Sequence, residues 1–124
     1  MLGANPILGF IFIRSKLMEF NEYQDKTRDT WLAQDPVTDI QRCLLGILGE
    51  AGELAEINKK RCRGDFETRE YIEKEKKELG DLLYYIARYS SLKGYYLEKI
   101  AQDNLKKLAS RKERGKIKGS GSSR

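Results

Sequence analysis

Two pairs of acidic residues are the side chains of this sequence best suited to chemistry. Glu50 and Glu53 lie in GEAGELAEI, and Glu78 and Asp81 lie in KELGDLLYYI, so the members of each pair are three residues apart. On a helix, side chains at this spacing lie roughly 60° from each other and project from one face. Four carboxylates on two such faces would supply the oxygen ligands that a hard cation such as Mg²⁺ prefers.

The residues around the acids predict that they border buried surface. Leu54 and Ile57 follow the first pair, and Leu82 and Ile86 follow the second. Carboxylates in such places must be neutralised, paired or bound to metal, because leaving them charged and dry costs several kcal/mol each. The spacing alone leaves a second interpretation open, in which solvated helix faces carry acids that pair with lysines.

The composition limits which catalytic residues and metal sites this chain can have. The chain has 124 residues, 40% of them apolar, which predicts one domain with one core. Histidine is absent, and Cys43 and Cys62 form no C-x-x-C motif, which excludes histidine catalysis and most zinc sites. Any metal is therefore expected to have oxygen ligands. Two isolated cysteines also fit a reducing compartment, so we expect a cytoplasmic location.

The charge and the ends of the chain set the expected domain boundaries. The net charge is +5, and much of the excess lies in the C-terminal KLASRKERGKIKGSGSSR, a distribution that argues against nucleic acid as the main partner. No stretch approaches the roughly 20 apolar residues that cross a membrane. Met18 begins MEFNEYQ like a natural start. We therefore expect residues 1–17 to be an upstream extension, 18–114 the domain, and 115–124 a basic Gly/Ser tail.

Apolar residues recur every three or four positions, which predicts an all-α chain, a bundle of about four helices. The expected helices cover about 19–32, 37–61, 68–92 and 95–114. Asp35 should cap the second helix, with Pro36 at its first position. Three glycines interrupt that helix near the acids, which indicates close helix packing or close approach by a ligand; these are Gly46, Gly49 and Gly52.

On these helices the acid pairs have the form E-x-x-E and E-x-x-D, within GEAGELAE and KELGDLLYYIA. At these residues the chain resembles the MazG-like, all-α nucleoside triphosphate pyrophosphohydrolases. The resemblance covers about residues 19–114. It extends through IAQDNLKKLASRKERG, where Asn104, Lys107 and Arg111 fit the pattern N-x-x-K-x-x-x-R of the last helix of many members.

The resemblance implies cleavage of a nucleoside triphosphate between its α and β phosphates, giving a nucleoside monophosphate and pyrophosphate. Such an activity would clean or adjust the nucleotide pool. The cofactor would be Mg²⁺, with Mn²⁺ as the alternative ion. By this resemblance the metal ligands and catalytic residues would be Glu50, Glu53, Glu78 and Asp81, with one of the glutamates as the general base.

Five further residues are candidates for substrate binding, and each has a structural alternative. The resemblance places Tyr85 beside the nucleotide and Asn104 and Lys107 at its sugar or phosphates; core packing or a solvated helix end would explain them equally. Trp31, the only tryptophan, could stack on a base or belong to the core. Lys60 could reach the β and γ phosphates or favour a helix C-terminus.

Four modest helices leave apolar surface such as Leu83, Tyr84 and Tyr89, so we expect a homo-oligomer, either a dimer or a tetramer. Two alternatives to the pyrophosphohydrolase remain. One is a non-catalytic helical interaction module whose basic tail binds nucleic acid or an acidic partner. The other is a related phosphohydrolase of a different phosphorylated metabolite.

Overall fold

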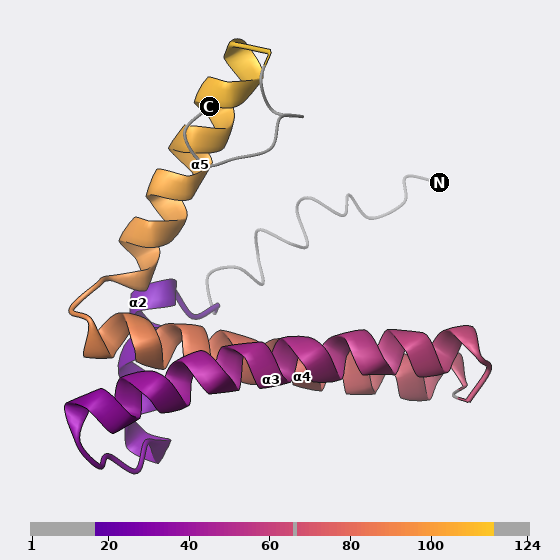
Figure 1. Cartoon of the computed structure of the whole chain (residues 1–124). Helices are drawn as coiled ribbons and strands as arrows, with labels where there is room; N and C mark the ends of the chain where they lie inside the picture. Colours follow the sequence, from indigo (N-terminus) through magenta and orange to yellow (C-terminus); the bar gives the residue numbers. More distant parts are fainter. Residues whose placement is uncertain (1–16, 66, 116–124) are drawn as a thin grey trace, which may run out of the picture.

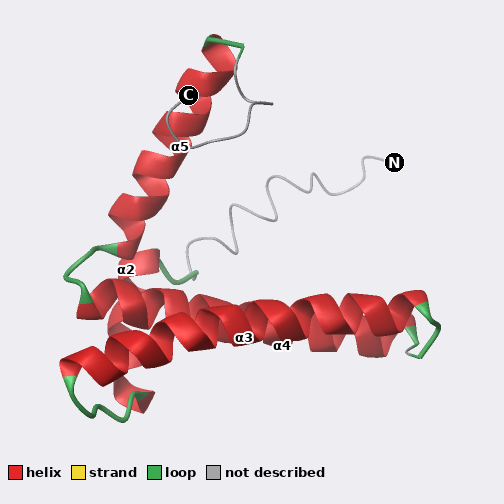
Figure 2. Ribbon diagram, in the orientation of Figure 1, coloured by secondary structure: helices red, strands yellow, loops and turns green. Residues whose placement is uncertain are grey.

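All the regular secondary structure of the described residues is helical. The computed structural model describes residues 17–65 and 67–115. Its elements are α2 (Phe20–Lys26), the 3₁₀ helix η1 (Thr27–Thr30), α3 (Pro36–Cys62), α4 (Thr68–Leu92) and α5 (Leu97–Glu113). Figure 2 shows no strand among the described residues. The all-α prediction is thus confirmed, whereas the expectations for 1–17 and 115–124 fall almost entirely outside the described residues.

Local sequence signals fix the ends of the long helices. The Asp35 carboxylate accepts a hydrogen bond of 3.0 Å from the Thr38 amide, and Pro36 follows at the first helical position, as expected. Beyond the C-terminal ends of α3 and α4, Gly64 and Gly94 have φ values of +82° and +74°. Glycine adopts this left-handed conformation without the steric cost of a Cβ atom, and so ends both helices.

The first helix is shorter than its periodicity predicts. Its α-helical part ends at Lys26 and a 3₁₀ turn continues to Thr30, instead of one helix to residue 32. The Thr27 hydroxyl donates to the Gln24 carbonyl at 2.7 Å, an alternative to regular backbone bonding that favours the tighter turn. As a result, Trp31 has extended backbone angles (φ −83°, ψ 119°) and lies beyond the helix.

The long helices α3 and α4 form an antiparallel hairpin, and α2 lies at the end of the hairpin opposite the connection between them (Figure 1). The chain then turns at Gly94, and α5 runs away from the hairpin. Among the described elements, α5 contacts α2 and α4 but not α3. None of the described helices is long and apolar enough to cross a membrane.

The two helices of the hairpin are in close contact where a tyrosine covers a glycine. A Cβ atom added to Gly46 of α3 would lie 2.5 Å from Cγ and Cδ1 of Tyr85 on α4. The ring therefore rests directly on the α3 backbone. Gly49 and Gly52 have no such neighbour, since an added Cβ would meet nothing within 4 Å in the described structure. Close packing accounts for Gly46 but not for the other two glycines.

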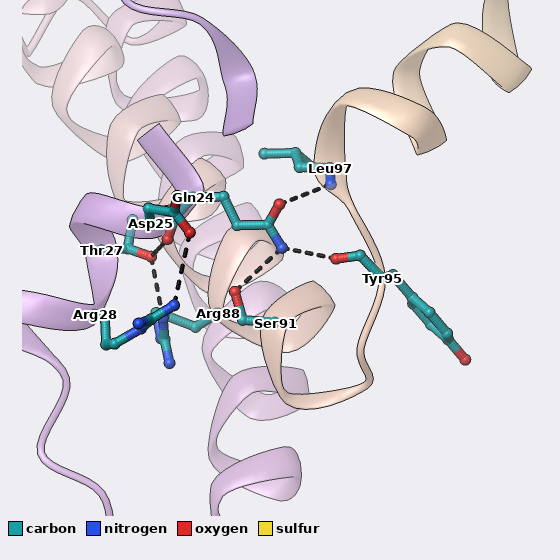
Figure 3. Close-up of polar contacts among 8 residues, drawn as sticks. All are labelled: Gln24, Asp25, Thr27, Arg28, Arg88, Ser91, Tyr95 and Leu97. Carbon is teal, nitrogen blue, oxygen red and sulfur yellow. Dashed lines mark hydrogen bonds and ion pairs between the residues drawn. The ribbon is translucent and has the colours of Figure 1, made fainter. Parts of the chain in front are cut away.

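The amide of Gln24 joins α2 to the start of α5 (Figure 3). Its Oε1 accepts from the Leu97 amide at 2.8 Å, and its Nε2 donates to the Tyr95 carbonyl at 2.7 Å and to the Ser91 hydroxyl at 3.1 Å. Tyr96, the residue before α5, makes no side-chain cap bond. Gln24 thus does the work of a cap from a distant segment and fixes where α5 leaves the hairpin.

Candidate functional site

Three carboxylates converge between the two long helices. Glu50 of α3 and Glu78 and Asp81 of α4 each place one carboxylate oxygen so that all three lie within 4.8 Å of one another. We call these three residues the acid cluster. Glu78 and Asp81 share a face of α4 because they are three residues apart, and the α3 register brings Glu50 opposite them. Oxygens this close can bind one cation together.

Glu78 is the most buried member of the cluster. The residue is 9% exposed, and its Oε2 is buried without a hydrogen-bond donor among the described residues. A buried polar atom without a partner is rare, because the loss of hydration is not offset. A proton or a bound cation would satisfy the Glu78 Oε2 atom.

The electrostatics of Glu50 reflect the same crowding. Burial raises the pKa of the Glu50 carboxyl above its ordinary value of 4.5, and contact with the Glu78 carboxyl raises it further. The negative charges of Glu53, Asp81 and Glu78 act in the same direction. Carboxylates that lie together without a counter-ion favour binding a proton, and a divalent cation would relieve the same repulsion.

The ion pairs seen along the two long helices join residues outside the acid cluster. Within residues 17–65 and 67–115, the ion pairs of the two long helices are Arg42 with Asp39, Lys59 with Glu56, and Lys74 with Glu70. No cluster member takes part in them. These ion pairs therefore do not support the interpretation in which the acids of the cluster merely meet lysines.

Glu53, the fourth acid of the sequence pattern, is not a member of the acid cluster. It is exposed and lines a neighbouring groove together with Lys60. Its charge still raises the Glu50 pKa, which places the two carboxylates near each other. The structure thus brings three of the four predicted acids together and leaves Glu53 at their edge.

The two candidate aromatic residues both pack against protein. Tyr85 lies over Gly46, as described above. Trp31 lies beneath the guanidinium of Arg42, whose Cζ is 4.3 Å from the ring centroid, and its ring is 6.3 Å from that of Tyr84. The indole nitrogen is buried without a hydrogen-bond acceptor among the described residues. Both residues are only partly exposed, as expected of the core alternative.

Within a single chain, Asn104 and Lys107 lie away from the acid cluster. Both are exposed on α5 and line a shallow pocket with Ile100 and Asp103. Because α5 does not contact α3, these side chains do not share a site with Glu50 in the described single chain.

Tyr23 of α2 lies near the acid cluster, which its position in the sequence does not reveal. Burial raises the pKa of its hydroxyl, and the Tyr84 hydroxyl and the negative charge of Asp81 raise it further. The tyrosine also lines a cavity of about 480 Å³ beside Leu83. The sequence shows Tyr23 only as part of an apolar helix face, because its approach to Asp81 depends on how α2 packs across the hairpin.

Comparisons with known proteins identify the family of this chain. The sequence model of the MazG nucleotide pyrophosphohydrolase domain matches residues 38–115, which include the whole acid cluster. The chain is also similar to the Gene 37 protein of Mycobacterium phage L5, with 38% identity over 92 residues, which are 73% of this chain and 81% of the phage protein. No solved structure matches the chain significantly. A match over most of the chain, with an all-α fold and facing acids, shows that this protein belongs to the MazG nucleotide pyrophosphohydrolase family.

Proposed function

We propose that the protein is a Mg²⁺-dependent nucleoside triphosphate pyrophosphohydrolase. The products would be a nucleoside monophosphate and pyrophosphate, and the role would be to clean or adjust the nucleotide pool. The family makes a nucleotide the substrate class and a divalent ion the usual cofactor. The observation that carries the proposal is the acid cluster, three carboxylate oxygens within 4.8 Å from two facing helices.

The donor set fits a divalent cation of the Mg²⁺ or Mn²⁺ type. All three donors are carboxylate oxygens, which these ions prefer, and the unpartnered Glu78 Oε2 is suited to face one. Glu50, Glu78 and Asp81 would hold the ion. When bound, it would neutralise phosphate charge and polarise the phosphoryl group, which removes the need for a nucleophilic side chain.

Glu53 would act as the general base of the reaction. It lies beside the acid cluster without belonging to it and is exposed to solvent, so a water molecule can reach it. The water oxygen bonds to the α-phosphorus, its proton passes to Glu53, and the bond from the α-phosphorus to the bridging oxygen breaks. The bond electrons leave on the pyrophosphate. Among the other candidates, Tyr85 and Trp31 would shape the nucleoside end through the packing described above.

We further propose that the chain works as a homo-oligomer. Leucines of α3 are left uncovered in a single chain, with Leu45 69% and Leu48 71% exposed, and Leu105 of α5 is 68% exposed. The sequence predicted that Leu83, Tyr84 and Tyr89 would form the surface for a partner. They are half-buried, so the more exposed leucines are the better candidates for that surface. A second copy would cover the leucines. It would also let Asn104 and Lys107 of one chain reach a nucleotide bound at the acid cluster of another.

The test is a screen of ribo- and deoxynucleoside triphosphates that measures released pyrophosphate. Asp81→Asn should lower the rate by about 100-fold or more, because it removes a proposed ligand. Glu53→Gln should lower the rate while leaving Mg²⁺ binding largely intact. The matched control is Glu73→Gln, an exposed acid of α4 outside the acid cluster, which should change the rate less than about twofold. Full activity in Asp81→Asn, or in EDTA, would refute the proposed reaction.

A further inference from the structure

Three buried side-chain atoms lack a hydrogen-bond partner within residues 17–65 and 67–115. One is the acceptor Glu78 Oε2 of the acid cluster, which a bound cation would satisfy. The other two are donors, Nε of Arg88 on α4 and the indole Nε1 of Trp31. Their side chains are neighbours, because the Arg88 Cζ atom lies 5.6 Å from the centroid of the Trp31 ring. Two buried donors on neighbouring side chains are suited to a shared acceptor.

Arg88 is a buried charge without a carboxylate partner. The residue is 5% exposed, and none of the ion pairs of the described ranges includes it. Its Nη1 donates to the Thr27 hydroxyl oxygen at 3.3 Å (Figure 3). A hydroxyl satisfies one N–H group but leaves the charge unbalanced, and a buried guanidinium without an anion is unfavourable.

The other guanidinium beside Trp31 already has its anion. Arg42 lies with its Cζ 4.3 Å from the ring centroid, and its Nη1 donates to the buried Asp39 carboxylate at 2.8 Å. The same carboxylate accepts from the Gln34 amide. Two guanidinium groups and one carboxylate therefore lie around the indole ring, which leaves one positive charge uncompensated.

Neither of the other candidates supplies the missing charge. Cys43 lies close enough for Arg88 to affect it, but burial raises the pKa of its thiol and outweighs the guanidinium charge, which lowers it. The thiol is therefore neutral near pH 7. The nearest acid of α4, Asp81, precedes Arg88 by seven residues, about 10 Å along the helix axis, and belongs to the acid cluster.

The space beside Arg88 suits a small ligand. Arg88 and Thr27 are each 5% exposed, so a ligand bound by both would be enclosed. One acceptor atom bridges two donors that are up to about 6 Å apart, twice an ordinary hydrogen-bond length. The 5.6 Å between Arg88 and Trp31 is of this size. A water molecule would accept the same bonds but bring no negative charge, so a monatomic anion fits the site better.

We propose that Arg88 and Trp31 bind a small monatomic anion of the chloride type, which joins η1 to α4. The anion would accept from Arg88 Nε and Trp31 Nε1 and balance the guanidinium charge. Thr27 begins η1 and Trp31 follows its last residue, so the hydroxyl contact and the anion would hold both ends of this turn against Arg88. The acid cluster takes no part in this site, which does not depend on the proposed reaction.

The first experiment measures thermal unfolding of the full chain in EDTA, without nucleotide, while sodium chloride replaces sodium gluconate at constant ionic strength. Constant ionic strength keeps screening unchanged, so a specific anion site is seen as a chloride-dependent Tm. The wild-type Tm should rise by about 5 °C once chloride exceeds its Kd tenfold.

Three variants assign the rise to this site. Arg88→Met keeps a long side chain but removes the charge, and should lose the rise. Trp31→Phe keeps an aromatic ring but removes the N–H donor, and should raise the Kd for chloride by about tenfold. The matched control is Arg28→Met, which removes an exposed arginine of η1 that pairs with Asp25 at 3.6 Å, and should keep the full rise.

The second experiment is a crystal structure of the wild-type protein in sodium bromide, because bromide replaces chloride and is identified by its anomalous scattering. A bromide peak beside Arg88 Nε and Trp31 Nε1 is the expected result. Bromide found only as an adventitious ion at the surface, or water at these two atoms, would overturn the proposal. The same holds for equal Tm values in chloride and gluconate, or a full chloride response in Arg88→Met. If Arg88→Met does not fold, Trp31→Phe and the bromide crystals decide.

Discussion

The contact between Gly46 and Tyr85 predicts opposite effects of the same substitution at neighbouring glycines. In Gly46→Ala the new Cβ would lie 2.5 Å from Cγ and Cδ1 and 2.6 Å from Cε1 of the ring. Nonbonded carbon atoms rest about 3.5–4 Å apart, so the ring or the helix must move by about 1 Å. At Gly49 the added methyl group meets nothing within 4 Å in the described structure.

The magnitudes follow from two opposing terms. Overpacking in a well-packed contact costs about 1–3 kcal/mol, and alanine in place of glycine returns up to about 1 kcal/mol of helix propensity. Gly46→Ala should therefore lower the free energy of unfolding by about 1–2 kcal/mol. Gly49→Ala has only the favourable term and should raise it by up to about 1 kcal/mol.

Urea unfolding of the metal-free protein measures both values, and a Mg²⁺ titration of the same samples measures the site. Gly46 lies one helical turn before Glu50, so a displaced contact should separate Glu50 from the α4 acids. We expect Mg²⁺ to stabilise Gly46→Ala less than the wild type. In the background of Tyr85→Ala, the cost of Gly46→Ala should largely disappear. If Gly46→Ala is as stable as Gly49→Ala, the packing argument is wrong.

Three further predictions concern other parts of the molecule. Gln24→Ala should destabilise the protein by about 2 kcal/mol and speed hydrogen exchange of the Leu97 amide, because buried backbone groups lose their partner; unchanged exchange would contradict the capping role. Because the pKa of Glu50 is raised above 4.5, the native state binds its proton more tightly than the unfolded chain. The contribution of Glu50 to the stability of the metal-free protein should therefore be fully present below this pH and fall as pH rises through the raised pKa, and Glu50→Gln should remove this fall in unfolding measured in EDTA. Equal pH slopes in the two proteins would contradict it. Leu48→Glu places a charge on a residue that is 71% exposed, so it should dissociate the oligomer in sedimentation without unfolding the chain; an unchanged mass would refute this interface.

Signals that act within a few residues were enough to predict the long helices. Asp35 and Pro36 begin α3, and Gly94 follows the end of α4, because capping and left-handed turns depend only on adjacent backbone. The first helix shows where periodicity fails. Its apolar spacing continues past Lys26, but the Thr27 hydroxyl offers the backbone a competing hydrogen bond that spacing does not register.

The sequence by itself determined the family, the all-α fold and the faces on which the acids lie, because 3.6-residue periodicity assigns each side chain a direction on its own helix. Only the tertiary structure decided which acids meet. Distances between helices depend on their register and on how closely they approach, and Tyr85 resting on Gly46 is part of what sets both. The same reason explains why Glu53 stands outside the acid cluster, why Tyr23 approaches Asp81, and why Lys60 and Lys77 share a groove from opposite helices.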